Sequence, residues 1–200
     1  MNALAAAHAA FPPQVRARRL KSAIEALASF PEGGEALSLL PADVRADIER
    51  VPGEGWLPLE RDVVLSHAVE RALGHEAAHA FARADGLRTF QGPFFRALAD
   101  GARQHTQGDL WELSRWMARA FWLAFRGCGR WQLGPSDDRV RRMRIVEVPA
   151  LCLADGVWLR RTVGALAALP LLGGVPAEVV VAGVDVPERR VELELRALRS

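Results

Sequence analysis

Residues 109–133 read DLWELSRWMARAFWLAFRGCGRWQL, and the hydrophobic period changes inside this stretch. Up to Arg126 the apolar side chains recur at helical spacing, and Asp109 stands where a side-chain cap begins a helix. From Gly127 onward apolar and polar residues alternate, which is the period of a strand. The stretch therefore predicts an aromatic-rich helix that leads directly into a sheet.

The residues after this junction predict an antiparallel sheet interrupted by one helix. We expect strands over 129–133, 140–148, 178–184 and 191–197, with a helix of about twenty residues over 154–172. In the last strand Val191, Leu193 and Leu195 alternate with Glu192 and Glu194. Such alternation predicts a sheet with one face against the core and one face in water.

The residues before the junction predict helices. Helical spacing covers 14–29, 37–48, 56–73 and 75–84, with Pro41 breaking the second range into one or two short helices, and Pro93 opens a further helix. Gly74 is expected to end the third of these helices and Asp85-Gly86 the fourth. The chain is thus an α+β protein, helical over two-thirds of its length and then strand, strand, helix, strand, strand. We expect one domain over 14–200, helical over 14–126 and sheet-bearing over 127–200, after a flexible N-terminus 1–13.

Charge and cysteine content exclude several classes of function. The 26 basic and 24 acidic residues are interspersed and give a net charge of only +2, so nucleic acid is not an expected partner. The Arg-rich runs 16–21 and 139–144 are expected to form the polar face of a helix and the solvent side of a strand. The longest apolar run, 163–175, is too short to span a bilayer. Two cysteines without metal spacing favour a reducing cytoplasm.

The pentapeptide HEAAH at 75–79 matches the short motif of zinc metallopeptidases. In such a site His75 and His79 bind the metal from one helix face, and Glu76 acts as general base on the bound water. An extended motif would need Gly at position 82 and His at position 85, where this chain has Ala82 and Asp85. The available third ligands are Asp100, His105, Asp109 and Glu112. A zinc-dependent hydrolase is therefore an alternative hypothesis and not the leading one.

Several stretches together resemble a known fold. They are the helix-to-strand passage 116–130, Gly156-Val157-Trp158-Leu159, Gly164-Ala165-Leu166, Trp56-Leu57-Pro58 and Leu73-Gly74. The C-terminal half resembles the sheet-bearing part of the heme-NO-binding (H-NOX) and 4-vinyl-reductase-like ligand-binding fold. The chain as a whole resembles a group of myxobacterial paralogues of similar length related to that fold.

The resemblance does not extend to the heme ligands. Heme-binding members carry an axial His on the helix before the first strand and a Tyr-x-Ser-x-Arg run on the next strands. Here the helix 110–126 contains no His, the chain contains no Tyr, and the corresponding strand reads Met143-Arg144-Ile145-Val146-Glu147. The resemblance therefore implies a cavity between helices and sheet, but not heme binding by that route.

The leading hypothesis is a non-enzymatic bacterial sensory or scaffold domain in the cytoplasm. It would bind a partner protein or a small apolar ligand, without heme, metal or another cofactor. The pocket candidates are Trp111, Trp116, Phe121 and Trp158, although aromatic side chains on a helix more often pack the core. No membrane association is expected, and the oligomeric state is left open.

Overall fold

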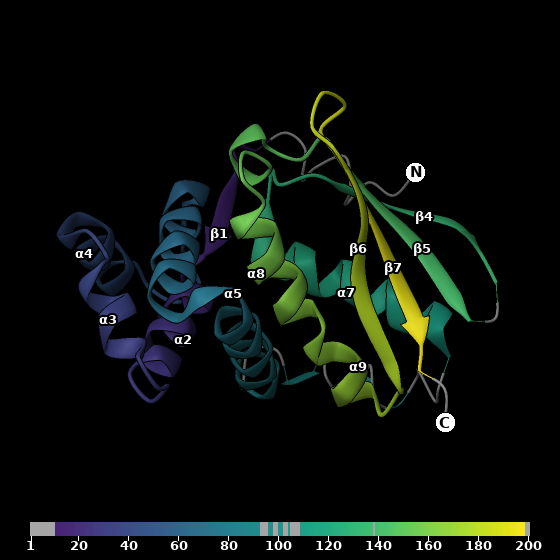
Figure 1. Cartoon of the computed structure of the whole chain (residues 1–200), viewed down its shortest axis with the longest axis horizontal. Helices are drawn as coiled ribbons and strands as arrows, with labels where there is room; N and C mark the ends of the chain where they lie inside the picture. Colours follow the sequence, from purple (N-terminus) through teal and green to yellow (C-terminus); the bar gives the residue numbers. More distant parts are fainter. Residues whose placement is uncertain are drawn as a thin grey trace.

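The computed structural model describes residues 11–92, 96–97, 100–101, 104, 109–137 and 139–198. The chain has an α+β fold in which helices precede an antiparallel sheet, so the predicted fold class is confirmed (Figure 1). Residues 1–10 of the expected flexible N-terminus, Pro93 and His105 lie outside the described residues. None of the helices that the structure describes combines the length and apolar character needed to cross a membrane.

The first part of the chain is built from packed helices. They are α2 (Ala17–Leu27), α3 (Gly33–Ser38), α4 (Ala42–Arg50), α5 (Leu59–Gln91) and α7 (Leu110–Ala124). In α2 the buried Leu20, Ala23 and Leu27 recur at spacings of three and four, so one face of this helix packs against α5. The Asp109 side chain accepts a hydrogen bond from the Trp111 amide over 2.7 Å, which caps α7 as predicted.

Helix α5 is broken at one residue. Gly74 has φ 74° and ψ 170°, so the first helical segment ends there as predicted. The second segment does not end at Asp85-Gly86 but continues to Gln91, so that prediction is wrong. Asp85 is buried in an ion pair, and Gly86 lies against Ala165 so closely that a Cβ would stand 2.4 Å from the Ala165 carbonyl oxygen. Asp85 and Gly86 therefore lie in the interior where α5 crosses the helix that carries Ala165, and they do not form a turn.

A small three-stranded sheet forms where helices were expected. Its strands are β1 (Gln14–Arg16), β2 (Trp56–Pro58) and β3 (Phe125–Arg126), in the order β2-β1-β3. Val15 pairs with Leu57 on one side and with Phe125 on the other, and all three side chains are buried. Strands of two or three residues are too short to show a period of two, and they exist because of this tertiary pairing.

The main sheet contains β4 (Arg130–Ser136), β5 (Val140–Val146), β6 (Ala177–Asp185) and β7 (Arg190–Ala197), in the order β4-β5-β7-β6. The predicted helix over 154–172 is two helices, α8 (Val157–Leu166) and α9 (Ala168–Gly173), which follow the short 3-10 helix η1 (Ala150–Cys152). Pro170 has no N–H to bond back into α8, and it stands in the first turn of α9, where that loss is tolerated.

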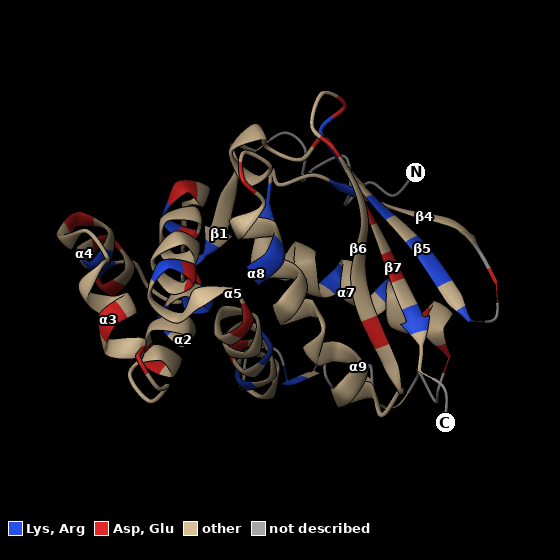
Figure 2. Cartoon of the chain, viewed as in Figure 1, with Lys and Arg blue, Asp and Glu red and all other residues tan. Residues whose placement is uncertain are grey.

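The two faces of the main sheet differ as the alternation predicted. Met143 and Leu193 point into the core beside α7. On the outer face Arg142 pairs with Glu194 at 3.4 Å and Arg144 pairs with Glu192 at 3.2 Å. Figure 2 shows these charges as blue and red bands along β5 and β7. Arg142 and Arg144 of the basic run 139–144 therefore lie on the solvent side of a strand, as expected. Arg141 instead lies on the face of Met143 and contacts Trp111 of α7, so the expectation is wrong for Arg141.

Candidate functional site

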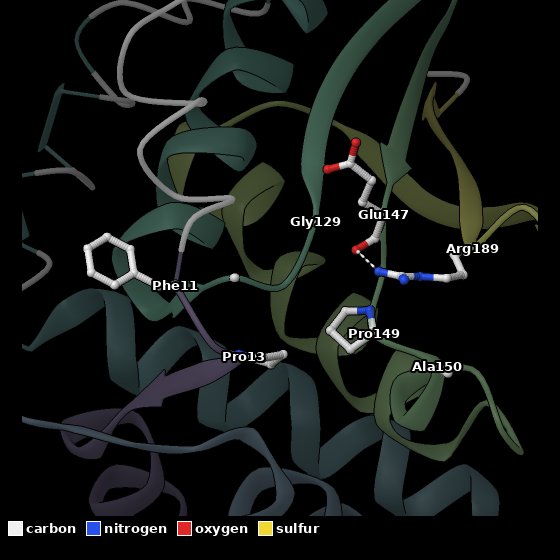
Figure 3. Close-up of a pocket in the computed structure, with 8 residues that line it drawn as sticks. Phe11, Pro13, Gly129, Glu147, Pro149, Ala150 and Arg189 are labelled. Atoms are coloured by element: carbon white, nitrogen blue, oxygen red, sulfur yellow. Dashed lines mark hydrogen bonds between the residues drawn. The ribbon is translucent and has the colours of Figure 1, made fainter.

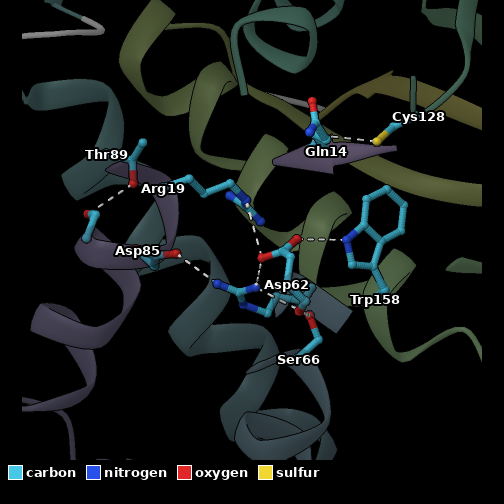
Figure 4. Close-up of polar contacts among 10 residues, drawn as sticks. Gln14, Arg19, Asp62, Ser66, Asp85, Thr89, Cys128 and Trp158 are labelled. Atoms are coloured by element: carbon cyan, nitrogen blue, oxygen red, sulfur yellow. Dashed lines mark hydrogen bonds and ion pairs between the residues drawn. The ribbon is translucent and has the colours of Figure 1, made fainter. Parts of the chain in front are cut away.

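Four charged side chains meet in the interior where α2, α5 and α8 pack together (Figure 4). They are Arg19 of α2, Asp62 and Asp85 of α5, and Arg161 of α8, and each is at most 5% exposed. We call them the buried four-charge cluster. Arg19 belongs to the basic run 16–21, so the expectation that this whole run lies on a polar helix face is wrong for Arg19.

Asp62 is the centre of this cluster. Its Oδ1 accepts a hydrogen bond from Arg161 Nη1 at 2.7 Å, and its Oδ2 accepts one from Trp158 Nε1 at 2.7 Å. Arg19 Nε lies 3.8 Å from Oδ1. Burial alone would raise the pKa of this carboxyl group, but the two guanidinium groups and the two hydrogen bonds outweigh burial and lower it. Asp62 is therefore a buried anion that its partners hold in the charged form.

Asp85 lies in the same cluster but has weaker partners. Arg161 Nη2 is 3.7 Å from its Oδ2, and neither carboxylate oxygen has a hydrogen bond in the described part of the chain. Burial raises the pKa of Asp85, and the opposing charges of Arg161 and Arg19 do not fully offset it. The two carboxyl groups of the cluster thus differ in their tendency to hold a proton.

A cavity of about 20 Å³ lies beside the cluster, between α2, the second segment of α5, α7 and α8. Arg19 and Thr162 supply its polar wall, and Phe90, Phe121 and Phe125 supply much of its apolar wall. Arg19 Nη2 and Thr162 Oγ1 are buried without a hydrogen-bond partner among the described residues. A space of this size with such groups suits one water molecule, whereas pockets for organic ligands measure about 300–1,000 Å³.

The four aromatic pocket candidates do not form a common site among the described residues. Phe121 lines the small cavity, and Trp158 is 2% exposed with its indole bonded to Asp62. Trp111 and Trp116 are only partly buried on α7. The guanidinium of Arg141 lies 4.6 Å from the Trp111 ring centroid, and that of Arg119 lies 4.6 Å from the Trp116 centroid. Trp111 and Trp116 therefore pack at the edge of the core, each under a guanidinium group.

The HEAAH motif lies on the exposed side of the second α5 segment. The His75 side chain is 70% exposed, and Glu76 and His79 are also exposed. Glu70 Oε1 lies 3.8 Å from His75 Nδ1, and it also binds Arg160 Nη2 at 2.5 Å. Within the described ranges, no group of three or more His, Cys, Asp or Glu side chains could hold a metal ion. The third ligand that the motif needs is thus missing from the described residues.

Sequence analysis missed the buried four-charge cluster although one signal was present. Asp62 and Ser66 follow Leu59 at helical spacing and share its buried face together with Leu65 and Val69. A carboxylate within an apolar stripe indicates a buried ion pair, because an unpaired charge there is too costly. Asp85 gave no comparable signal, because Asp-Gly is also a common end of a helix.

Solved structures resemble this chain in their fold. No protein-family model matches the chain, and no curated protein sequence matches it significantly. An unliganded Fe(II) form of a mutant H-NOX protein from K. algicida aligns with a TM-score of 0.59 and 7% identity, over 92% of this chain and 97% of that chain. An oxygen-binding H-NOX domain related to soluble guanylate cyclases, in its oxygen complex, aligns with a TM-score of 0.59 and 13% identity, over 92% of this chain and 95% of that chain. The chain has an H-NOX-like fold. At these identities the H-NOX likeness concerns the fold and not the chemistry.

Proposed function

We propose that this chain is a sensory or scaffold domain of H-NOX-like fold that binds a partner protein without heme, and that it is related to the myxobacterial paralogues that its sequence resembles. The observation that carries the proposal is the packing at the junction of α2, α5 and α8. Among the described residues, the buried four-charge cluster and the rings of Phe121, Phe125 and Trp158 occupy this junction, which supports a domain without heme.

Two further features support a domain without heme. Helix α7, which precedes the first strand of the main sheet, contains no His, and the chain contains no Tyr. Among the described residues, the cavity between α7 and α8 has about 20 Å³, which is far below the range of about 300–1,000 Å³ for pockets that bind organic ligands. The same volume argues against a small apolar ligand in this interior, so the partner-protein half of the hypothesis is the stronger one.

The outer edge of β6 is the surface that we propose for the partner. No other strand in the described chain pairs with this edge of the nine-residue strand. Val181 and Val184 are 38% and 46% exposed. Strand β6 also contains no Lys or Pro, the residues that often prevent the pairing of an edge strand with another chain. An extended segment of a partner can add to such an edge through backbone hydrogen bonds.

Heme uptake tests the first half of the proposal. We expect protein expressed with heme supplied, and protein titrated with hemin, to show no Soret band and no bound iron. The variant Phe121→Ala enlarges the cavity without adding an iron ligand, and it should behave in the same way. A saturable Soret band at one heme per chain would contradict the proposal.

Two matched valine variants test the second half. Val184 lies in β6, whereas Val186 lies just beyond the strand and is 51% exposed. A complex isolated from cells of the source organism should be lost with Val184→Lys and kept with Val186→Lys. Equal effects of the two substitutions would show that the β6 edge is not the contact.

Metal analysis tests the alternative hydrolase. Stoichiometric zinc in the purified protein, together with its loss in His79→Ala, would favour a metal site at His75 and His79 over our proposal. We expect the wild-type protein to contain less than stoichiometric zinc, because the described residues supply no third ligand.

A further inference from the structure

A second and much larger cavity lies at one end of the main sheet, away from the buried four-charge cluster (Figure 3). It has a volume of about 350 Å³, which falls within the range of pockets for small organic ligands. The N-terminal segment before β1, the loop between β3 and β4, the loop after β5 and the turn before β7 form its walls. We call it the sheet-end pocket. Its role is independent of the function proposed above.

The walls of this pocket are held in an unusual backbone conformation. Gly127, Gly129, Glu147 and Arg189 all line it, and all have positive φ, with values of 64°, 114°, 61° and 50°. Positive φ is uncommon for residues with a side chain and is maintained only where the surroundings fix it. Arg189 provides this support, because its Nε donates to the Val148 carbonyl at 2.9 Å and its Nη2 donates to the Glu147 carbonyl at 3.1 Å.

The fixed charges at the pocket leave one positive charge in excess. Arg130 binds the Glu147 carboxylate through Nε at 3.0 Å and Nη2 at 2.5 Å, so these two charges cancel. Arg189 bonds to backbone carbonyls and forms no ion pair with a carboxylate of the described chain. Within the described residues, Arg189 uses two of its five N–H donors, so the edge formed by Nη1 and Nη2 keeps donors for an incoming anion.

Positive charge also gathers on the other side of the pocket. The guanidinium of Arg126, next to Gly127, lies 4.7 Å from the ring centroid of Phe11, which lines the pocket. This guanidinium adds to the positive potential that Arg189 gives the region, so an anion is favoured over a neutral ligand there.

We propose that the sheet-end pocket binds a small organic carboxylate. The carboxylate bonds to the free edge of the Arg189 guanidinium, whose planar fork matches two carboxylate oxygens. The apolar body of the ligand packs against Phe11, Pro13 and Pro149, which line the same cavity. The pocket thus combines one uncompensated cation with an apolar wall.

Isothermal titration with matched probes tests this proposal. We expect saturable binding of benzoate or hexanoate, weakened by added NaCl, and at least about tenfold weaker binding of the neutral isostere benzamide or hexanamide. Absence of saturable binding by both carboxylates, or equal affinity for the neutral probes, would overturn the proposal.

Two variants assign the binding to Arg189. Arg189→Gln should weaken carboxylate binding at least about tenfold, whereas Arg190→Gln should not, because Arg190 pairs with Asp185 at 2.9 Å. Unchanged affinity in Arg189→Gln would overturn the assignment. Should Arg189→Gln fail to fold, Glu147→Gln decides the matter. Loss of that negative charge must strengthen carboxylate binding and leave the neutral probes unchanged, and an unchanged carboxylate affinity would refute the proposal.

Discussion

The indole N–H of Trp158 on α8 donates a hydrogen bond to the carboxylate of Asp62 on α5 over 2.7 Å, where Asp62 is fully buried. Trp158→Phe keeps most of the ring volume but removes this donor, so one carboxylate oxygen loses its partner. We expect the free energy of unfolding to fall by about 1–3 kcal/mol, measured by urea denaturation followed by circular dichroism. Trp111→Phe, at a partly exposed ring, serves as control and should cost less than about 1 kcal/mol.

Asp62→Asn removes the anion that compensates two buried guanidinium groups. Arg161 and Arg19 would then face each other with only Asp85 as counter-charge, and we expect a loss of about 3–5 kcal/mol in the free energy of unfolding. The matched substitution Asp43→Asn breaks a pair with Arg61 in which the Asp43 side chain is 68% exposed, and it should cost about 0–1 kcal/mol. Similar losses in both variants would mean that the buried four-charge cluster does not stabilise the fold.

Asp85 makes stability depend on pH in a defined direction. Its pKa is raised in the folded state, so folding favours the protonated carboxyl group. The stability that this group contributes is present below the unfolded pKa of about 3.9 and is lost as the pH rises through the folded pKa. The neutral amide introduced by Asp85→Asn mimics the protonated carboxyl group at every pH. The stability of the wild type minus that of the variant should therefore fall from pH 4 upward and then level off.

Asp62 contributes to pH dependence with the opposite sign. Its pKa is lowered in the folded state, so its contribution is present above the unfolded pKa and is lost as the pH falls through the folded pKa. Subtracting the Asp85→Asn curve from the wild-type curve cancels the part of the surface carboxylates and leaves that of Asp85 together with its coupling to Asp62. A pH-independent difference between the two proteins would contradict the raised pKa of Asp85.

The two cysteines should be inert in the folded protein. Cys128 and Cys152 are each 1% exposed, and burial raises the pKa of Cys128 to about 12 and that of Cys152 further. Because the thiolate is the reactive form, we expect no reaction with a thiol reagent at pH 8 until the protein unfolds. Both thiols should then react in denaturant. Labelling of either thiol in the native state would reveal local opening near β3 or η1.

The parts of the fold that the sequence predicted are those set by local periodicity. Val191 and Leu193 alternate with Glu192 because one face of β7 packs against the core and the other face contacts water. The strands β1 and β2 could not be predicted in this way, because Val15 and Leu57 become strand residues only through each other. The hydrophobic period of a segment predicts the secondary structure of that segment alone. It does not predict which distant segments pair with each other.

The candidate sites were less predictable for a related reason. Asp85 next to Gly86 has the composition of a turn, and only the approach of α8 makes these residues interior. The sheet-end pocket depends on Glu147 and Arg189, which lie more than forty residues apart and are joined by backbone contacts. Neither residue belongs to a motif, so their meeting is a property of the tertiary structure alone.

The crossing of α5 and α8 depends on the absence of a side chain at Gly86. A Cβ at this position would lie 2.4 Å from the Ala165 carbonyl oxygen and 2.9 Å from the Ala165 Cα, so a helix backbone would have to move. We expect Gly86→Ala to lower the free energy of unfolding by about 1–3 kcal/mol, although alanine is the better helix former. Gly34→Ala is the matched control, because a Cβ at this position meets nothing within 4 Å. This substitution should stabilise α3 by up to about 1 kcal/mol.

The same crossing also positions Asp85 opposite Arg161. Displacement of α8 by Gly86→Ala should lengthen the 3.7 Å ion pair, so the effects of Gly86→Ala and Asp85→Asn are expected to be coupled. A double-mutant cycle measured by urea denaturation tests this, with Gly34→Ala in place of Gly86→Ala as the uncoupled reference. Additive effects of Gly86→Ala and Asp85→Asn would show that the close helix crossing does not hold the buried charges in place.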